Sequence, residues 1–373
     1  MRTNVYVGFG TGKCIVLGGT PRQLEKERGM SEAQSIGLWN YASAGRDKFF
    51  SEMQPEQEKL RPVPWDAHYE WDETSMFGFN IPEHGIDCII YYWHHPVMRT
   101  VYGGIMIWQG LNTDAIGCAY TDYRLAMPMP ADITDCTYAN GVKVKMVEPM
   151  KEFDISFDDD ARNTHLRLNL KAIMPPACRY NNNHITQAMK TAGELVLNGE
   201  RYTIDGFHSR DRSWNECRDE SQLHIPPLNW TVGIANEGFA FHHTSFDNRK
   251  YRPEWRNLFP GHGDDNNCLW GYVWDEGELL GITTVDQNTS YAWDPFRPER
   301  VKTVLTASNG KRYAINGRQI ASTQIQCWPN MTGNFALMEW DCGDKGTAYG
   351  DIQMCTWSDA YKLMDSLNPR HRL

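Results

Sequence analysis

Four short turn signals, each between two strand-like runs, constrain the fold of this chain more than any other sequence feature. They are Asn198-Gly199, Glu237-Gly238, Glu276-Gly277 and Asn316-Gly317. An Asn-Gly pair supplies the positive φ angles of a two-residue type I′ turn, so Asn198-Gly199 and Asn316-Gly317 predict β-hairpins. The two Glu-Gly sites lie between similar strand-like runs and look like two more hairpins. Consecutive hairpins build antiparallel meanders, which close into barrels or pack as sandwiches. The spacing therefore predicts an all-β fold, with strands at 193–197, 201–204, 230–235, 239–245, 269–274, 278–284, 312–315 and 318–325.

The first half of the chain carries similar strand patterns, and the chain length sets the number of domains. Runs rich in β-branched and aromatic residues predict strands at 86–93, 104–111, 143–147 and 166–173. A chain of 373 residues suits two domains of about 100 to 200 residues each. The strand pattern breaks between residues 172 and 184, at Pro175-Pro176 and an Asn triplet, and segment 21–60 has a helical composition. We expect a partly helical N-terminal extension at 1–61, a first β domain at 62–180 and a second at 181–373.

Charge and apolar patterning exclude several classes of partner. The net charge of -10 is spread without long like-charge blocks, so the chain lacks the clustered basic face that nucleic acid or an anionic membrane requires. Its N-terminus has no signal-peptide pattern, and no segment is apolar for long enough to cross a bilayer. The sequence therefore predicts a cytoplasmic protein without an integral membrane segment. Its 14 Trp and 17 Tyr suit strands and a pocket for an apolar ligand.

No cofactor is predicted. The run from Gly8 to Lys13 is one residue short of a phosphate loop and is followed by Cys14, so it does not predict nucleotide binding. The ten cysteines never show C-x-x-C spacing, which favours reduced core thiols over a zinc site. Adjacent strand residues point to opposite faces, so neither His94-His95 nor His242-His243 can supply two ligands to one metal. We expect no metal.

The densest polar cluster runs from Asp205 to Arg218 and places Asp211 between Arg210 and Arg212. A carboxylate beside guanidinium groups has a lowered pKa, whereas burial against Trp214 would raise it. A carboxyl kept neutral by burial can donate a proton, and a paired carboxylate mainly fixes architecture. Both interpretations, a proton donor and a buried salt-bridge knot, stay open on composition alone.

This cluster also carries a resemblance to a known family. The pattern Gly206-x-x-x-x-Asp211-Arg212-Ser213-Trp214, preceded by a strand containing His184-x-x-Gln187-Ala188-Met189, resembles the motif of carotenoid 1,2-hydratase-like (hydroxyneurosporene synthase-like) proteins. The likeness covers roughly residues 70 to 355, and its specific part is 184–218. The chain departs from the motif at Asn215, where the family has Gly, and by an extra residue before Arg218.

The resemblance implies two lipocalin-like antiparallel β domains and proton-transfer chemistry on an apolar substrate. Hydration of an alkene, or the reverse dehydration, passes through a carbocation-like state that needs a poised acid, aromatic faces and a polar group for the water. Asp211 is the expected acid, and Arg210 and Arg212 are its expected electrostatic partners. His184 is a second acid–base candidate. The expected substrate-binding residues are Trp71, Trp93, Trp214, Trp230 and Gln187.

The function most consistent with these features is a cofactor-free hydratase, dehydratase or isomerase acting on a hydrophobic terpenoid, prenylated or similar small molecule. A non-catalytic, lipocalin-like carrier of an apolar ligand is the main alternative, since an aromatic-lined β cavity binds without chemistry. A β-sandwich glycosidase that uses Glu339 and Asp341 is a third. Nothing in the sequence determines the substrate or the oligomeric state.

Overall fold

The structure, a computed structural model, describes residues 49–69, 71–180, 183–217, 225–259, 267–292, 297–328 and 331–367. All of them belong to one compact unit, residues 45–373. The strands are β1 (Phe50–Ser51), β2 (Trp71–Ile81), β3 (Ile86–His95), β4 (Thr100–Gln109), β5 (Tyr120–Pro128), β6 (Asp135–Thr137), β7 (Lys143–Glu148), β8 (Glu152–Asp159), β9 (Thr164–Ala172), β10 (Ala177–Arg179), β11 (His184–Leu197), β12 (Glu200–Cys217), β13 (Leu228–Asn236), β14 (Phe239–Phe246), β15 (Cys268–Asp275), β16 (Glu278–Tyr291), β17 (Pro298–Ala307), β18 (Arg312–Trp328), β19 (Met331–Asp341) and β20 (Thr347–Trp357). The α-helices are α2 (Trp255–Leu258) and α3 (Ser358–Leu367), and a 3-10 helix covers Pro55–Glu58.

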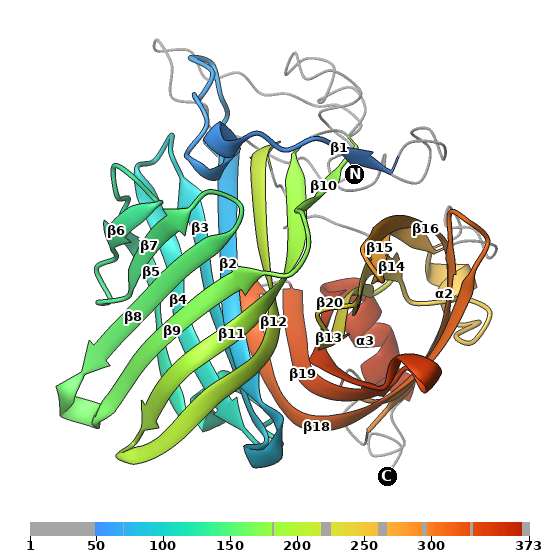
Figure 1. Ribbon diagram of the computed structural model, residues 1–373. Coiled ribbons are helices and arrows are strands. Elements are labelled where there is room, and N and C mark those ends of the chain that lie inside the picture. The colour runs from blue at the N-terminus through green and yellow to red at the C-terminus, as the bar shows by residue number, and fades with distance from the viewer. Residues whose placement is uncertain are drawn as a thin grey trace. The chain divides into compact units, whose positions relative to one another are not determined.

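Strands β1 to β12 form one curled antiparallel sheet (Figure 1). Its order is β5-β4-β3-β2-β12-β11-β9-β8-β7-β6, with β1 and β10 attached beside β11. The predicted strands of the first half are confirmed as β3, β4, β7 and β9. Side chains of β8 and β9 alternate between buried and less buried positions, as expected for strands with one face on a core. The prediction of an all-β fold is confirmed.

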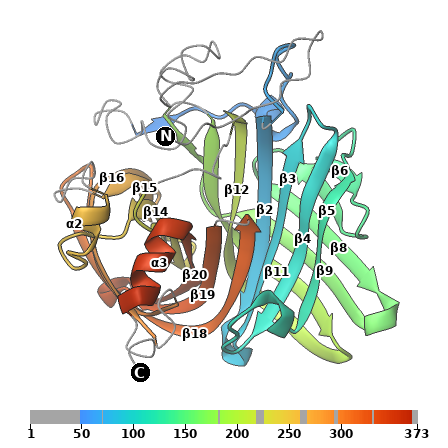
Figure 2. The ribbon, with the colours of Figure 1, turned by 180° about the vertical axis from the view of Figure 1, so that it is seen from behind.

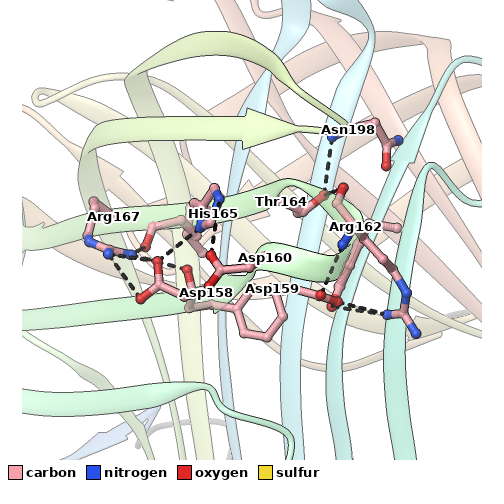
Figure 3. Close-up of polar contacts among 11 residues, drawn as sticks. Asp158, Asp159, Asp160, Arg162, Thr164, His165, Arg167 and Asn198 are labelled. Carbon is pink, nitrogen blue, oxygen red and sulfur yellow. Dashed lines mark hydrogen bonds and ion pairs between the residues drawn. The ribbon is translucent and has the colours of Figure 1, made fainter.

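The predicted hairpin at Asn198-Gly199 is confirmed as the turn between β11 and β12. Both residues have positive φ, 51° and 92°, as the turn requires. The neighbouring β8–β9 turn supports it: Asn198 N donates to Thr164 Oγ1 at 3.1 Å (Figure 3). Around that turn, Arg167 and Asp158 form an ion pair at the exposed end of the sheet. Such exposed pairs contribute little stability.

Strands β13 to β20 form a closed barrel. The turns at Glu237-Gly238 and Glu276-Gly277 join β13 to β14 and β15 to β16, as predicted. The turn predicted at Asn316-Gly317 is wrong, because both residues lie inside the continuous strand β18, opposite Asp341 and Trp340. Gly317 is needed there for packing: a Cβ atom at this position would lie 2.4 Å from the Trp340 ring.

The change from sheet to barrel falls between Cys217 and Leu228, after β11 and β12 have paired within the sheet. The sequence placed its division between residues 180 and 181, and the division into domains stays a prediction. The helices predicted for 21–60 lie mostly outside the described residues, and the 3-10 helix Pro55–Glu58 falls within that range. Within the described part of the chain, no helix combines the length and apolar character needed to span a membrane.

Hydrophobic cores fill the curled sheet and the barrel, and two further clusters join them. One joining cluster packs Met76 and Trp108 of the sheet against Phe335 and Leu337 of the barrel. The other packs Ala188 with barrel residues including Trp270 and Tyr272. Figure 2 shows α3 beside β20, and α3 packs against α2 through residues such as Trp255 and Met364. One face of the sheet is therefore covered by the outer surface of the barrel.

Candidate functional site between the sheet and the barrel

The hairpin β11–β12 carries most of the predicted site residues, and strand alternation divides them between its two faces. Successive side chains point to opposite faces, and residues in register share a face. Gln187 is in register with Arg210, and Thr186 with Asp211, so Asp211 lies on the face opposite Arg210 and Arg212. We call the two faces the arginine face (Ile185, Gln187, Arg210, Arg212 and Trp214) and the inter-sheet face (His184, Thr186, Asp211 and Ser213).

Arg210 is held on the arginine face by a bidentate ion pair. Its Nη1 and Nη2 donate to the two carboxylate oxygens of Glu58 at 3.0 and 2.7 Å, and both side chains are 2% exposed. Its Nε donates to Gln187 Oε1 at 2.8 Å. The Gln187 amide in turn donates to the carbonyl oxygens of Met150 and Met174. These bonds use the whole side-chain amide of Gln187 to hold the sheet together. The sequence had predicted that Gln187 binds substrate.

Arg212 is paired in a similar way with Glu73. Its Nη2 lies 2.6 Å from Glu73 Oε2, and its guanidinium also donates to the carbonyl oxygens of Gln57 and Lys59. Burial raises the pKa of Glu73, against the lowering effect of the Arg212 charge. The expectation that Arg210 and Arg212 are partners of Asp211 is therefore corrected, because alternation directs both guanidinium groups to glutamates on the other face.

The predicted tryptophans of the sheet do not form one wall. Trp214 is fully buried on the arginine face, in a cluster with Met53 and Cys178. Trp71 begins β2 opposite Cys217 and is only partly buried. Trp93 stacks on Tyr102, with ring centroids 4.4 Å apart.

Trp93 nevertheless shares the inter-sheet face. It is in register with Thr74, and Thr74 is in register with Ser213. Trp93 is therefore the predicted sheet tryptophan that lies on the same face as Asp211.

His184 lies at the centre of the inter-sheet face. Its Nδ1 is 2.7 Å from Ser213 Oγ and its Nε2 is 3.1 Å from Thr186 Oγ1. The rings of Trp230 and Trp270 lie nearly perpendicular to the imidazole, at 85°, with centroids at 5.0 and 5.7 Å. The structure thus brings two predicted residues, His184 and Trp230, into contact.

The barrel contributes an aromatic patch to this contact. His242 lies 4.4 Å from Trp230, 5.3 Å from Trp270 and 5.7 Å from Tyr272, measured between ring centroids. Burial, and then the neighbouring His243, lower the pKa of His242 well below its ordinary value. The patch is therefore uncharged at neutral pH, which suits an apolar ligand.

Gln353 connects this patch to Asp211. It is in register with Trp230 on the outer surface of the barrel. Its Nε2 donates to Asp351 at 2.6 Å and lies 3.6 Å from the sulfur of Met76. Met76 is in register with Asp211, which is 7% exposed. Asp211, His184 and Trp230 thus belong to one region where the sheet meets the barrel, which we call the inter-sheet site.

A further polar group in this region was not anticipated from the sequence. His208 of β12, Asp87 of β3 and Asp351 of β20 are all at most 3% exposed, and His208 Nε2 lies 3.7 Å from Asp87 Oδ1. The three residues are far apart in the chain and share no local motif. Only the packing of the barrel strand β20 against the sheet brings them together.

Several buried polar atoms of the inter-sheet site have no hydrogen-bond partner among the described residues. They are Thr74 Oγ1, Asp87 Oδ2, Ser209 Oγ, Trp230 Nε1, His242 Nε2, Tyr272 OH and Asp351 Oδ1. An unsatisfied buried polar atom costs about 1–3 kcal/mol. At this site they are groups with which a bound molecule can form hydrogen bonds.

The other predicted chemistry lies elsewhere. Glu339 forms an ion pair with Arg318 at 2.8 Å on the outer surface of the barrel, and Asp341 beside it is exposed. Within the described ranges, no group of three or more His, Cys, Asp or Glu side chains has the arrangement of a metal site.

Comparisons with known proteins give a family match and similar folds. The sequence matches the family model described as "Domain of unknown function (DUF7064)" over residues 55–358. No curated protein matches it significantly. Among solved structures, CghA matches with a TM-score of 0.50 and 10% identity over 85% of this chain and 96% of that chain. Kievitone hydratase from Nectria haematococca matches with a TM-score of 0.46 and 12% identity over 77% and 89%. At these identities the likeness concerns the fold alone.

Proposed function

This chain belongs to the family described as a domain of unknown function, DUF7064, and we propose that it is a cofactor-free hydratase, dehydratase or isomerase acting on a hydrophobic small molecule in the inter-sheet site. The observation that carries the proposal is the sharing of one enclosed face by Asp211, His184 and the rings of Trp230 and Trp270. Fold alone does not fix function, so the case depends on these side chains.

Their arrangement suits a reaction through a carbocation. A buried carboxyl can protonate an alkene or an alcohol leaving group, and Asp211 is the proposed donor. The faces of Trp230 and Trp270 would stabilise the cation through their quadrupoles. The imidazole of His184, tied to Ser213 at 2.7 Å, is suited to hold the water. A terpenoid or prenylated substrate is the class suggested by the family resemblance of the 184–218 segment.

The test begins with the ligand. Organic extraction of the purified protein followed by mass spectrometry would name the class of any copurifying molecule. That molecule, and a panel of prenyl alkenes and alcohols, would then be incubated with the wild type and with Asp211→Asn in water labelled with oxygen-18. We expect the wild type to add, remove or exchange one water, and D211N to do so slower by a factor on the order of 10² to 10⁴. A ligand that is bound and returned unchanged and unlabelled would instead establish the carrier.

A further inference from the structure

His208 lies 3.7 Å from one carboxylate and within the electrostatic influence of a second, and the two come from different sheets. Asp87 belongs to the curled sheet and Asp351 to the barrel, and each has one carboxylate oxygen without a hydrogen-bond partner among the described residues. Nδ1 of His208 lies 2.8 Å from the Ser209 carbonyl oxygen. A carbonyl can only accept, so Nδ1 carries the hydrogen, and Nε2, which faces Asp87, is the nitrogen that binds and releases a proton.

The fold makes room for this imidazole. A Cβ atom at Gly78 would lie 2.4 Å from His208 Cε1 and 2.7 Å from its Nδ1, so only glycine allows the ring to occupy this place. Gly78 is in register with Ile89, two residues from Asp87 on β3. The position of His208 therefore depends on the sequence of β2 as well as on its own strand.

The surrounding charges favour a bound proton. Burial alone would lower the pKa of His208, but the hydrogen bond with Asp87 and the charge of Asp351 together raise it above its ordinary value. Burial raises the pKa of Asp87 to about 6, against the effect of His208. His208 therefore holds its proton more tightly than a free imidazole, and its partner Asp87 titrates near pH 6, in the range where an acid–base catalyst is effective.

The other elements around His208 add no charge to this balance. The thiol of Cys88, next to Asp87, stays protonated because burial raises its pKa. β2 contributes Gly78, and β11 contributes Met189 opposite His208. Asp87 and Asp351 are thus the described carboxylates that control the proton on His208.

The group is connected to the inter-sheet site through Gln353. The Gln353 amide donates to Asp351 and touches Met76, which is in register with Asp211. Asp211 is three residues from His208 on the same strand, an odd separation that places side chains on opposite faces of a regular strand. The His208 ring nevertheless occupies the space over Gly78, which shares the inter-sheet face with Met76, so it lies on the same side of the sheet as Met76. A proton donor and a proton acceptor therefore lie near one another where the sheet and the barrel meet.

We propose that His208, supported by Asp87 and Asp351, is the catalytic base that exchanges a proton with the reacting water, an inference that rests on the proposed function. In hydration, Asp211 gives its proton to an alkene carbon and becomes a carboxylate. Water forms a C–O bond to the cation, and His208 Nε2 takes the proton that this water releases. The proton returns through solvent to Asp211, so both residues end as they began and the net change is alkene plus water to alcohol. Dehydration runs the same steps in reverse.

The experiment uses nerolidol, a tertiary allylic alcohol, as the probe. Reversible dehydration in water labelled with oxygen-18 places the label in the recovered alcohol, which mass spectrometry measures. We expect the wild type to exchange oxygen faster as pH rises through the pKa of His208, because the neutral imidazole is the base. His208→Gln should slow exchange about 10²-fold. Asp351→Asn removes a negative charge that raises the pKa of His208, so it should move the rise in rate to lower pH by about half a unit or more.

The matched control is Asp205→Asn, which removes an exposed carboxylate on the same strand that is paired with Lys190 and should leave the pH profile unchanged. If the wild type exchanges oxygen and D351N keeps the wild-type profile, His208 is not the base, and this result stands even if H208Q fails to fold. If the wild type exchanges oxygen and a folded H208Q exchanges it equally fast, the inference also fails while the proposed function survives. If the wild type exchanges no oxygen into nerolidol or into the copurified ligand, both fail together.

Discussion

The two faces of the β11–β12 hairpin both meet buried charged groups, and these groups are paired differently on each face. On the arginine face, Arg210 and Arg212 each have a glutamate oxygen within 2.7 Å and further bonds to amide or carbonyl oxygens. On the inter-sheet face, His184 bonds to hydroxyls, and Asp87 and Asp351 each have an unsatisfied oxygen. Fully paired buried charge fixes a structure, whereas incompletely paired charge can respond to a ligand. We therefore assign a structural role to the arginine face and the proposed chemistry to the inter-sheet face.

Breaking a pair on the arginine face should have the largest effect on stability. Glu58→Gln leaves the buried Arg210 guanidinium without its counter-charge, which costs about 3–5 kcal/mol of unfolding free energy. Chemical denaturation measures it. Asp205→Asn is the control, because Asp205 is 73% exposed and its pair with Lys190 contributes at most about 1 kcal/mol. An E58Q protein as stable as D205N would remove the structural role of this face.

The second largest effect should come from pH, which should change the stability contributions of His94 and His208 in opposite directions. Burial, and then the Arg212 charge, lower the pKa of His94 to about 3, and His94 bonds to Tyr138 and to the Glu73 carbonyl oxygen. A group with a lowered pKa binds fewer protons when folded, so its contribution is full above about pH 6.5 and falls below it. His94 alone should cost roughly 2 kcal/mol between pH 7 and pH 5. The pKa of His208 is raised, so its contribution is instead lost as pH rises.

Unfolding curves at several pH values check these opposite signs. The variant His94→Gln should flatten the loss of stability on acidification, and His208→Gln should leave that loss in place. Equal acid sensitivity in wild type and H94Q would show that His94 is solvated or already paired as a cation.

Asp211→Asn should change stability least. Asp211 lies opposite the arginines, so removing its charge leaves neither Arg210 nor Arg212 unpaired. We expect a change below about 1 kcal/mol, within the range of ordinary substitutions, together with the loss of turnover described above. Thermal melting beside the oxygen-exchange assay measures both. A destabilisation as large as that of E58Q would show that Asp211 has a structural role instead.

The turn chemistry of the sequence predicted much of the fold, and its one failure has a local cause. Asn198-Gly199 and Asn316-Gly317 are the same dipeptide, yet only the first is a turn. Gly317 is required because the Trp340 ring occupies the space of its missing side chain, and no window around residue 317 reveals a partner on another strand. The break at Pro175-Pro176 lies between β9 and β10 of the curled sheet, and the division into domains near it stays a prediction.

The site was also predictable only as far as local sequence signals reach. Alternation within β12 is visible in the sequence and suffices to separate Asp211 from Arg210 and Arg212. The partners of the two arginines cannot be read from the sequence, because Glu58 lies 152 residues from Arg210 along the chain. The group of Asp87, His208 and Asp351 had no local signal, since each residue belongs to a different strand and only tertiary packing buries them together.

The pairing of β2 with β12 also governs how the protein can be made. Glu73 and Arg212 are 139 residues apart, so a chain emerging from the ribosome has completed β2 to β5 long before β12 exists. During that interval β2 has no neighbour on one edge, and the carboxylate of Glu73 has no cation. Closing so large a loop is slow, and exposed strand edges associate with other chains. Production of this protein should therefore depend on chaperones or low temperature more than its native stability suggests, and chains truncated before β12 should aggregate.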